Sequence, residues 1–353
     1  MSERIITEWL IDPNTCFLLG AGCSSCAGKP LMSKLTEIVQ LEMTDALKKE
    51  LNNLKGRNSR PANIEDLINF LLQKEKLLSS QVKFEEDDWS PDKIRIEIKN
   101  IQHAIVKAIG TAWDISITHL NFFRRFQGQS YSSIRDIFSL NYDTLLEACF
   151  EELKLPYTDG FRGSENAYFE SRLFDISPSY GTFFKLFKLH GSINWIRDND
   201  DTVRRRPTNQ IGDEERVVLY PTEQKYIQTQ YGIYETLLGY FRKRLKENRQ
   251  NNKLVVLGYS FNDEHINVAI VDSILAPESN LTVYAFVGPE NDQETQIKQL
   301  SEMVNICDNR LNFFVSDSNF IGKAFDETEW ESIKNKDLWK FENLVKLFSG
   351  GNV

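Results

Sequence analysis

The sequence predicts an α/β fold: a Rossmann-like, doubly wound parallel sheet with an inserted helical lobe. Four apolar runs are typical of buried strands, and each ends on a cluster of small or polar residues. A long stretch with helical periodicity separates the first run from the second. Because a doubly wound sheet gathers the carboxyl ends of its strands along one edge, where ligands bind, the four clusters are expected to line one crevice.

The first apolar run, residues 15–19, leads into a glycine-rich turn that contains Gly20, Ala21 and Gly22. Such small residues let backbone N–H groups approach a pyrophosphate, and a helix that begins near Pro30 would direct its positive end at the anion. The third glycine of the usual fingerprint is Ser25 here. The turn therefore predicts a dinucleotide cradle.

Residues 40–130 are predicted to be a helical insertion within a single catalytic domain that spans residues 1–353. Asn63 is placed to cap a helix whose apolar residues recur at helical spacing, and isoleucines over 94–109 form a second stripe. The acidic run at 84–91 is interpreted as a solvated loop between these helices. Such a lobe could cover the crevice or form an assembly surface.

The second and third apolar runs end on the polar clusters whose side chains are best suited to catalysis. Residues 136–140 end on Asn141-Tyr142-Asp143, and residues 186–189 end on His190-Gly191-Ser192. Residues 197–216 are charged and predicted to be irregular.

The carboxyl-terminal part continues the alternation of strands and helices. We expect a strand at 217–220 and a helix over about 231–247, and then the fourth run, 254–257, which ends on Gly258-Tyr259-Ser260. A fifth run, 281–287, ends on residues 288–291 and could close the same edge. Residues 329–353 are predicted to form a C-terminal helix, whose apolar stripe suits core packing or an oligomer contact.

Charge and composition exclude several classes of protein. The net charge of −9 over 353 residues argues against direct nucleic-acid binding, which depends on clustered Lys and Arg. The run Arg204-Arg205-Arg206 is interpreted as a solvated loop beside nearby aspartates. The amino terminus lacks the apolar core of a signal peptide, and no apolar run approaches the ~20 residues that span a bilayer. We expect a soluble, cytoplasmic protein without a membrane partner.

The five cysteines favour free thiols in a reducing compartment. Cys23 and Cys26 form a CxxC pair, but a tetrahedral zinc site needs four ligands, and the sequence offers no second pair with suitable spacing. No metal site is expected, and the two thiols are interpreted as small residues in a tight turn.

Four ordered motifs resemble those of the sirtuin family. They are Gly-Ala-Gly-Cys-Ser at 20–24 followed by Gly-Lys-Pro at 28–30, Ser-Leu-Asn-Tyr-Asp at 139–143, Lys-Leu-His-Gly-Ser at 188–192, and Gly-Tyr-Ser-Phe at 258–261. Tyr142 and the stretch 258–267 are similar to the bacterial antiphage branch, whose members hydrolyse NAD. The resemblance implies that NAD⁺ is bound by Gly20, Ala21, Gly22, Ser24, Gly28, Pro30, Gly258, Ser260 and Asn291.

Two departures from the family bear on the reaction. Protein-deacylating sirtuins carry a four-cysteine zinc module after the histidine motif, whereas this chain has no cysteine between Cys149 and Cys307. They also carry an Asp-Phe-Arg triplet where this chain has Leu31-Met32-Ser33. Both favour water as the acceptor, and thus an NAD⁺ glycohydrolase that releases ADP-ribose and nicotinamide. The alternatives are a protein deacylase or ADP-ribosyltransferase, and a non-catalytic NAD-binding scaffold.

The residues themselves suggest roles in such a reaction. Cleavage of the bond between nicotinamide and ribose passes through an oxocarbenium-like species. The Asn141 amide offers a donor and an acceptor that could orient a ribose hydroxyl and a water, while Asp143 could anchor the loop or hold the ribose. His190, with an ordinary pKa near ~6.5, can accept a proton near neutral pH. His265 could be structural or close to the ligand.

The resemblance also implies partners. The compact chain is similar to the sirtuin-like subunit that is encoded alongside a HerA-type hexameric DNA-translocating ATPase. We therefore expect a homo-oligomeric antiphage effector of abortive infection, with its activity controlled by assembly with that ATPase.

Overall fold

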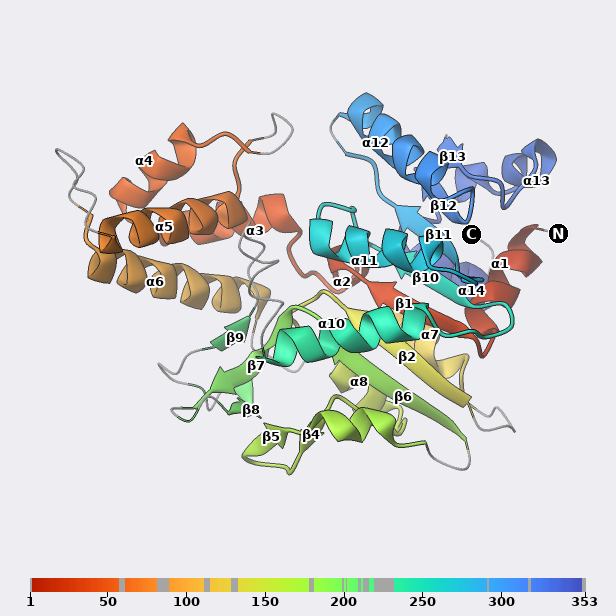
Figure 1. The fold of residues 1–353 in the computed structure, drawn as a ribbon, viewed down its shortest axis with the longest axis horizontal. Coiled ribbons are helices and arrows are strands. Elements are labelled where there is room, and N and C mark those ends of the chain that lie inside the picture. The colour runs from red at the N-terminus through yellow and green to blue at the C-terminus, as the bar shows by residue number, and fades with distance from the viewer. Residues whose placement is uncertain are drawn as a thin grey trace.

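The computed structural model has an eight-stranded sheet at its centre (Figure 1). Its strands are β1 (Thr15–Leu19), β2 (Ser133–Ser139), β3 (Tyr157–Thr158), β6 (Thr182–Lys188), β10 (Lys253–Leu257), β11 (Thr282–Val287), β12 (Leu311–Val315) and β13 (Asn319–Ile321). The structure describes residues 2–56, 61–80, 89–110, 115–127, 133–177, 181–198, 200, 202–208, 211, 216–218, 232–290, 292–316 and 319–350.

The strand order is β13-β12-β11-β10-β1-β2-β6-β3, and neighbours run parallel except β12 and β13. From β1 the chain builds β2 and β6 on one side, and later β10, β11 and β12 on the other. The topological switch point of this doubly wound sheet therefore lies between β1 and β10. The predicted fold class is confirmed, while the strands β3, β12 and β13 were not predicted.

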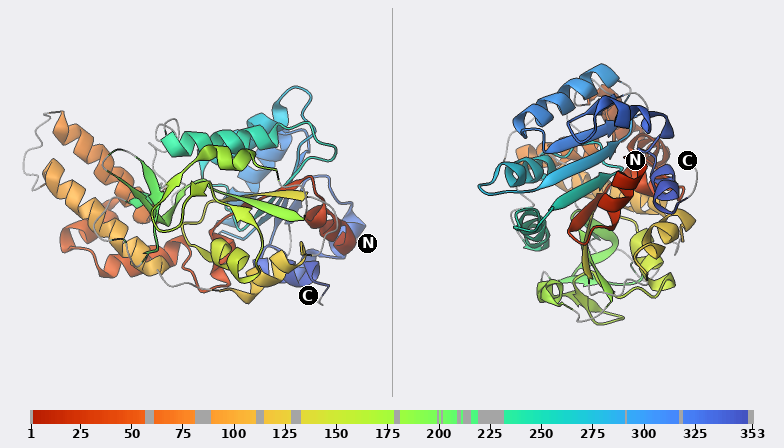
Figure 2. Two further views of the ribbon diagram at one scale, coloured as in Figure 1. Left: turned by 90° about the horizontal axis from the view of Figure 1, so that it is seen from below. Right: turned by 90° about the vertical axis from the view of Figure 1, so that its right-hand side faces the viewer.

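Helices cover both faces of the sheet (Figure 2). Successive residues of β1 point to opposite faces, so Cys16 and Leu18 enter one core while Phe17 and Leu19 enter the other. This explains why β1 is apolar without alternation. The first core includes α10 (Gly232–Leu245), α11 (Glu264–Leu275) and α12 (Gln293–Ile306), and the second includes α1 (Ser2–Ile11), α7 (Ile117–Arg124), α8 (Leu145–Glu152) and α14 (Phe341–Phe348).

The helical lobe has a core of its own and lies beside the sheet (Figure 1). Its helices are α3 (Met32–Leu41), α4 (Asp45–Asn53), α5 (Ile64–Ser79) and α6 (Pro91–Ile109). The predicted cap is confirmed, because Asn63 and Asp66 form a capping box at α5. The lobe core starts at Leu35 and ends at Ile109, apart from Ile193, so its limits differ from 40–130. Most of the acidic run at 84–91 lies outside the described residues.

The middle of the chain forms a second, five-stranded sheet in the order β4-β5-β8-β7-β9. Its strands are β4 (Phe161–Arg162), β5 (Ala167–Phe169), β7 (Gly191–Arg197), β8 (Val203–Arg205) and β9 (Arg216–Val218). The interpretation of Arg204-Arg205-Arg206 as a solvated loop was therefore wrong, because Arg204 and Arg205 are in β8 and all three side chains are half-buried. The prediction that residues 197–216 are irregular was wrong for the same strand. Ion pairs with acidic partners make this charged strand possible: Arg205 pairs with Asp159, and Arg204 and Arg206 pair with Asp198.

The prediction of one C-terminal helix over 329–353 was also wrong. The structure has α13 (Glu327–Glu331), a 3-10 turn at Lys334–Lys336, and then α14. Asp337 breaks the helix because its φ of 49° is left-handed, and the Asn343 amide donates to the carbonyl of Lys336 across the turn. Ile333 and Leu338 on either side are buried in one core, so the apolar stripe survives the break. Residues 351–353 lie outside the described part.

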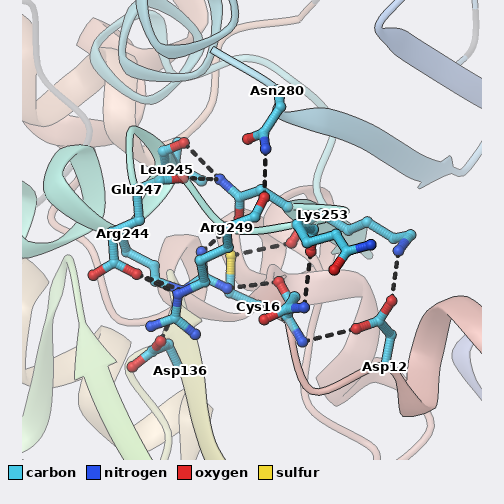
Figure 3. Close-up of polar contacts among 12 residues, drawn as sticks. Asp12, Cys16, Asp136, Arg244, Leu245, Glu247, Arg249, Lys253 and Asn280 are labelled. Atoms are coloured by element: carbon cyan, nitrogen blue, oxygen red, sulfur yellow. Dashed lines mark hydrogen bonds and ion pairs between the residues drawn. The ribbon is translucent and has the colours of Figure 1, made fainter. Parts of the chain in front are cut away.

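A buried polar cluster joins the amino-terminal ends of the strands, at the edge opposite the predicted site (Figure 3). The Arg244 guanidinium on α10 donates to Asp136 at 2.8 Å, to the Asn252 side chain at 2.6 Å and to the Asn14 carbonyl at 2.7 Å. One side chain thus ties α10 to β2 and to the loops before β1 and β10. Burial raises the pKa of the neighbouring Cys16 thiol to about 11, so this thiol is protonated.

We expect His119 to make the fold acid-sensitive. It is 1% exposed on α7, with its ring 4.9 Å from that of Phe341, and burial lowers its pKa to about 4. The unfolded chain, with a His pKa near ~6.5, therefore binds the proton first, so stability that is complete above that value is lost as the pH falls toward 4. Urea unfolding at pH 7 and pH 4 should show about 3 kcal/mol of this loss in the wild type but not in His119→Phe. Equal losses in both proteins would contradict this assignment.

Candidate functional site

The loops that follow β1, β2, β6 and β10 all begin at the same edge of the sheet. Backbone hydrogen bonds continue beyond the strands: Leu140 N–H donates to the Leu19 carbonyl, Gly20 N–H to the Leu257 carbonyl and Leu189 N–H to the Ser139 carbonyl, each at 2.9 Å. Parallel strands that end in register bring their following residues to one edge. The structure therefore brings the four predicted clusters to the same edge of the sheet.

The glycines after β1 are required by the loop after β10. A Cβ on Gly20 would lie 2.5 Å from the Gly258 carbonyl oxygen, and one on Gly22 would lie 2.7 Å from the Gly258 Cα. Gly258 itself has a φ of 64°, which favours glycine. These three glycines thus allow two loops to touch at the switch point. The predicted helix near Pro30 is confirmed, since α3 begins at Met32. The five-residue α2 (Ala21–Ser25), which begins right after Gly20, was not predicted.

Asn141, Ser24 and Asp143 form a hydrogen-bonded chain across this edge. The Asn141 Nδ2 donates to the Ser24 hydroxyl at 2.8 Å and to the Gly20 carbonyl at 3.0 Å, and the Ser24 hydroxyl donates to Asp143 Oδ2 at 2.7 Å. The other oxygen of Asp143 accepts from Leu145 N–H at the start of α8. Both carboxylate oxygens are therefore engaged, and Asp143 anchors the loop.

The side-chain oxygen of Asn141, unlike the carboxylate oxygens of Asp143, is not engaged in a hydrogen bond with another described residue. It is buried and has no hydrogen-bond partner within the described part of the chain. Because an unpaired buried acceptor is costly, such an atom indicates a place where a ligand or water donates a hydrogen bond.

A buried ion pair contacts and stabilises the Asn141–Asp143 loop. Lys188, the last residue of β6, donates from Nζ to the Asp143 carbonyl and lies 3.3 Å from Glu147 Oε1 on α8. The side chains of Lys188 and Glu147 are 1% and 5% exposed. Burial raises the pKa of Glu147, and the charge of Lys188 opposes that rise. This pair was not predicted from the sequence, although a lysine within an apolar strand is a signal that could have shown it.

His190 follows β6 and is 3% exposed. Its Nε2 lies 3.3 Å from the Nε2 of His265, which is on α11 and 4% exposed. The loop that carries Asn141 runs beside it, since the Tyr142 carbonyl accepts from Ile193 N–H at 3.0 Å and from the Ser192 hydroxyl at 3.2 Å. Asn141 and His190, from two different loops, and His265, from the first turn of α11, therefore meet at one edge.

A pocket of about 470 Å³ opens beside this edge. Gly28 lines it and is exposed, with a φ of 77°, and a Cβ at this position would have no heavy atom within 4 Å. The Lys29 ammonium crosses to the Ile109 carbonyl at 2.8 Å and links the turn to α6. Neither Asn141 nor His190 lines this pocket, which is formed by Cys26, Ala27, Gly28, Lys29, Ile109, Ile115, Ser116 and Ile117.

The remaining predicted binding residues lie at the outer part of the edge. Ala21 and Ser260 are exposed, Pro30 is half-buried, and the Ser260 hydroxyl accepts from the Asn262 amide at 3.0 Å. Asn291 lies outside the described residues.

The cysteines of the chain all lie within the described residues and are not arranged as a metal site. All five cysteines are free thiols, and Cys23 and Cys26 belong to α2 and its C-cap. Among the described residues, no group of three or more His, Cys, Asp or Glu side chains is arranged to hold a metal ion. In the same part of the chain, no helix combines the length and apolar composition of a membrane span.

Gly22, which is packed against another loop, and Gly28, which faces open space, should respond differently to substitution. Gly22→Val should lower the free energy of unfolding by about 1–3 kcal/mol, because its side chain would press on the backbone of Gly258. Gly28→Ala should cost only the strain of a left-handed residue, about 1–2 kcal/mol, without any clash. Thermal unfolding compares the two variants, and a Gly22→Val protein as stable as the wild type would contradict the packing role.

Part of the chain matches the model of a known domain family. Residues 135–307 match the family model of the SIR2-like domain, and this segment, from β2 through α12, includes Asn141, His190, Gly258 and His265. The match supports a sirtuin-like fold and an NAD-related activity. A solved structure that matches is a Sir2 homologue with a histidine-to-asparagine substitution, in complex with ADP-ribose. It is 11% identical, with 88% of this chain and 96% of that chain covered and a TM-score of 0.35. No curated protein matches the chain.

Proposed function

We propose that this protein hydrolyses NAD⁺ to ADP-ribose and nicotinamide. The observation that carries the proposal is the unpartnered, buried Asn141 side-chain oxygen, held at the same edge as His190. The match of residues 135–307 to the SIR2-like domain supports NAD as the substrate. The lack of cysteines between Cys149 and Cys307 supports water, rather than an acyl-lysine peptide, as the acceptor.

In the proposed reaction, the bond between ribose C1′ and nicotinamide breaks and nicotinamide leaves with the bonding electron pair. Water forms the new bond to C1′ and gives up a proton. The Asn141 oxygen accepts a hydrogen bond from the water or from a ribose hydroxyl, which places it for attack. His190 takes the proton, since an imidazole is a suitable base near neutral pH. Asp143 contributes by holding Ser24, which in turn holds the Asn141 amide.

Gly20, Ala21, Gly22, Ser24, Gly28, Pro30, Gly258, Ser260 and Asn291 remain the proposed NAD-binding residues. For Gly20, Gly22 and Gly258 the proposed role is indirect, because their lack of side chains brings the two loops at the switch point together. Ala21 and Gly28 are exposed, so a ligand can reach them.

We further propose that the activity serves abortive antiphage defence in the cytoplasm. Because uncontrolled NAD hydrolysis would kill the cell, the enzyme must be held inactive until it is needed. Self-assembly and a HerA-type ATPase are the proposed controls. Co-expression followed by size-exclusion chromatography tests the partner, and separate elution of the two proteins would refute it.

The direct test incubates the purified chain with NAD⁺, alone and with the ATPase, and follows nicotinamide and ADP-ribose by chromatography. We expect release of both in equal amounts without an acyl peptide. Product that forms only when an acyl peptide is present would instead indicate a deacylase. Binding of NAD⁺ without turnover under every condition would indicate a scaffold.

A further inference from the structure

We infer that His265 is a positioning residue that fixes the tautomer and the orientation of the His190 imidazole. The inference deepens the proposed hydrolysis and rests on it for its effect on turnover. It stands on the contact between the two rings, whose Nε2 atoms are 3.3 Å apart in a buried setting.

The contact restricts where protons can reside. A hydrogen bond between two Nε2 atoms requires one to carry a proton and the other to offer a lone pair. In the neutral pair, one ring is therefore the Nε2–H tautomer and the other is the Nδ1–H tautomer. Two rings that both carry Nε2–H would direct two donors at each other, so the contact selects a complementary pair.

The loop before His265 is rigidly built. The Tyr259 hydroxyl accepts from Asp263 N–H at 3.0 Å and contacts Asn267 Oδ1 at 2.9 Å, and the Asn267 amide donates to the Phe261 carbonyl at 2.7 Å. These bonds hold Phe261 at a left-handed φ of 60°, a conformation that a bulky residue adopts only when its surroundings impose it. His265 therefore occupies a defined place rather than a mobile loop.

The helix position of His265 adds an electrostatic preference. His265 is the second residue of α11, whose N-cap is Asp263. The positive end of a helix disfavours an additional positive charge in its first turn. His265 is therefore suited to stay neutral as the Nδ1–H tautomer and to accept a hydrogen bond from His190 Nε2–H. In that arrangement Nδ1 of His190 keeps its lone pair and takes the proton of the reaction.

The experiment measures histidine tautomers directly by ¹⁵N NMR of histidine-labelled protein without NAD⁺. The chain has only four histidines, and the signals of His190 and His265 are assigned by their loss in His190→Gln and His265→Gln. We expect complementary tautomers for the two rings in the wild type. Two Nε2–H tautomers, or two independently averaging rings, would overturn the inference.

Two variants extend the test to function. His265→Phe keeps a ring but removes the hydrogen bond, so the His190 signals should show a mixture of tautomers. Its kcat should fall at least about 10-fold, a part of the 10²–10⁴-fold that a general base contributes, with unchanged NAD⁺ affinity. His265→Gln, whose amide can reach the position of Nε2, should restore a single tautomer and much of the rate.

The outcomes separate this inference from the proposed function. Unchanged His190 signals and an unchanged kcat in His265→Phe would overturn the inference even if the wild type hydrolyses NAD⁺. Complementary tautomers in a wild-type protein that does not hydrolyse NAD⁺ would support the pairing and refute the hydrolase.

Discussion

Asn141→Ala is expected to lower NAD⁺ turnover at least about 10²-fold, the loss typical of removing one well-placed polar group from an active site. The substitution removes a side-chain acceptor at this edge that is both buried and unpartnered among the described residues. It also removes the amide that bridges Ser24 and Gly20. Nicotinamide release under saturating NAD⁺ measures the effect.

Two control variants make this result specific. Asn280→Ala removes an amide that donates to the Arg249 carbonyl at the opposite edge, so turnover should remain normal (Figure 3). Asn141→Asp keeps an oxygen but places a carboxylate against the Gly20 carbonyl, and should also be inactive. Circular dichroism and thermal unfolding should show that Asn141→Ala retains the fold. Near-normal turnover in a folded Asn141→Ala protein would remove Asn141 from the mechanism.

Lys188→Met is expected to lower the free energy of unfolding by about 3–5 kcal/mol, because it leaves the Glu147 carboxylate buried without its cation. This is a large share of the 5–15 kcal/mol that stabilises a typical domain, and partial unfolding at 37 °C is expected. The Asp143 carbonyl also loses its donor, so the Asn141–Asp143 loop should loosen. Urea unfolding measures the loss.

The matched control is the double variant Lys188→Met with Glu147→Leu, which removes both charges. It should recover most of the lost stability, because a buried ion pair can often be replaced by apolar side chains at little cost. A double variant no more stable than Lys188→Met alone would mean that the ion pair is not what stabilises this region.

The main sheet could be predicted because each central strand carries its own local signal. Buried parallel strands need unbroken apolar runs, and β1, β10 and β11 have them, each followed by turn residues. The second sheet could not be predicted in this way. Its strands are short, and the charge of Arg205 in β8 is neutralised by Asp159, more than forty residues away in the chain. Such pairing is invisible to a local pattern.

In the candidate site, too, the residues with a local sequence signal could be predicted and the contacts between distant elements could not. Asn141 and His190 could be named from the sequence because each directly follows an apolar run. The support of the site could not, since Lys188 with Glu147, and His265 with His190, are pairs that only the packing of distant elements creates. For Gly20 and Gly22, the turn after β1 was predicted from the sequence, but their packing against Gly258 was not.

The place of β1 in the sheet bears on how a ribosome-bound chain acquires its structure. Residues 15–19 emerge early, but their partners on the two sides are residues 137–139 and 253–257. The central strand can therefore pair with β2 before half of the chain is made, but its other side has no partner until β10 is synthesised. Such distant pairing slows folding and favours association with chaperones. Gly258 and His265 come later still. A nascent or prematurely terminated chain consequently lacks half of the crevice, and the complete site arises only when synthesis has passed α11.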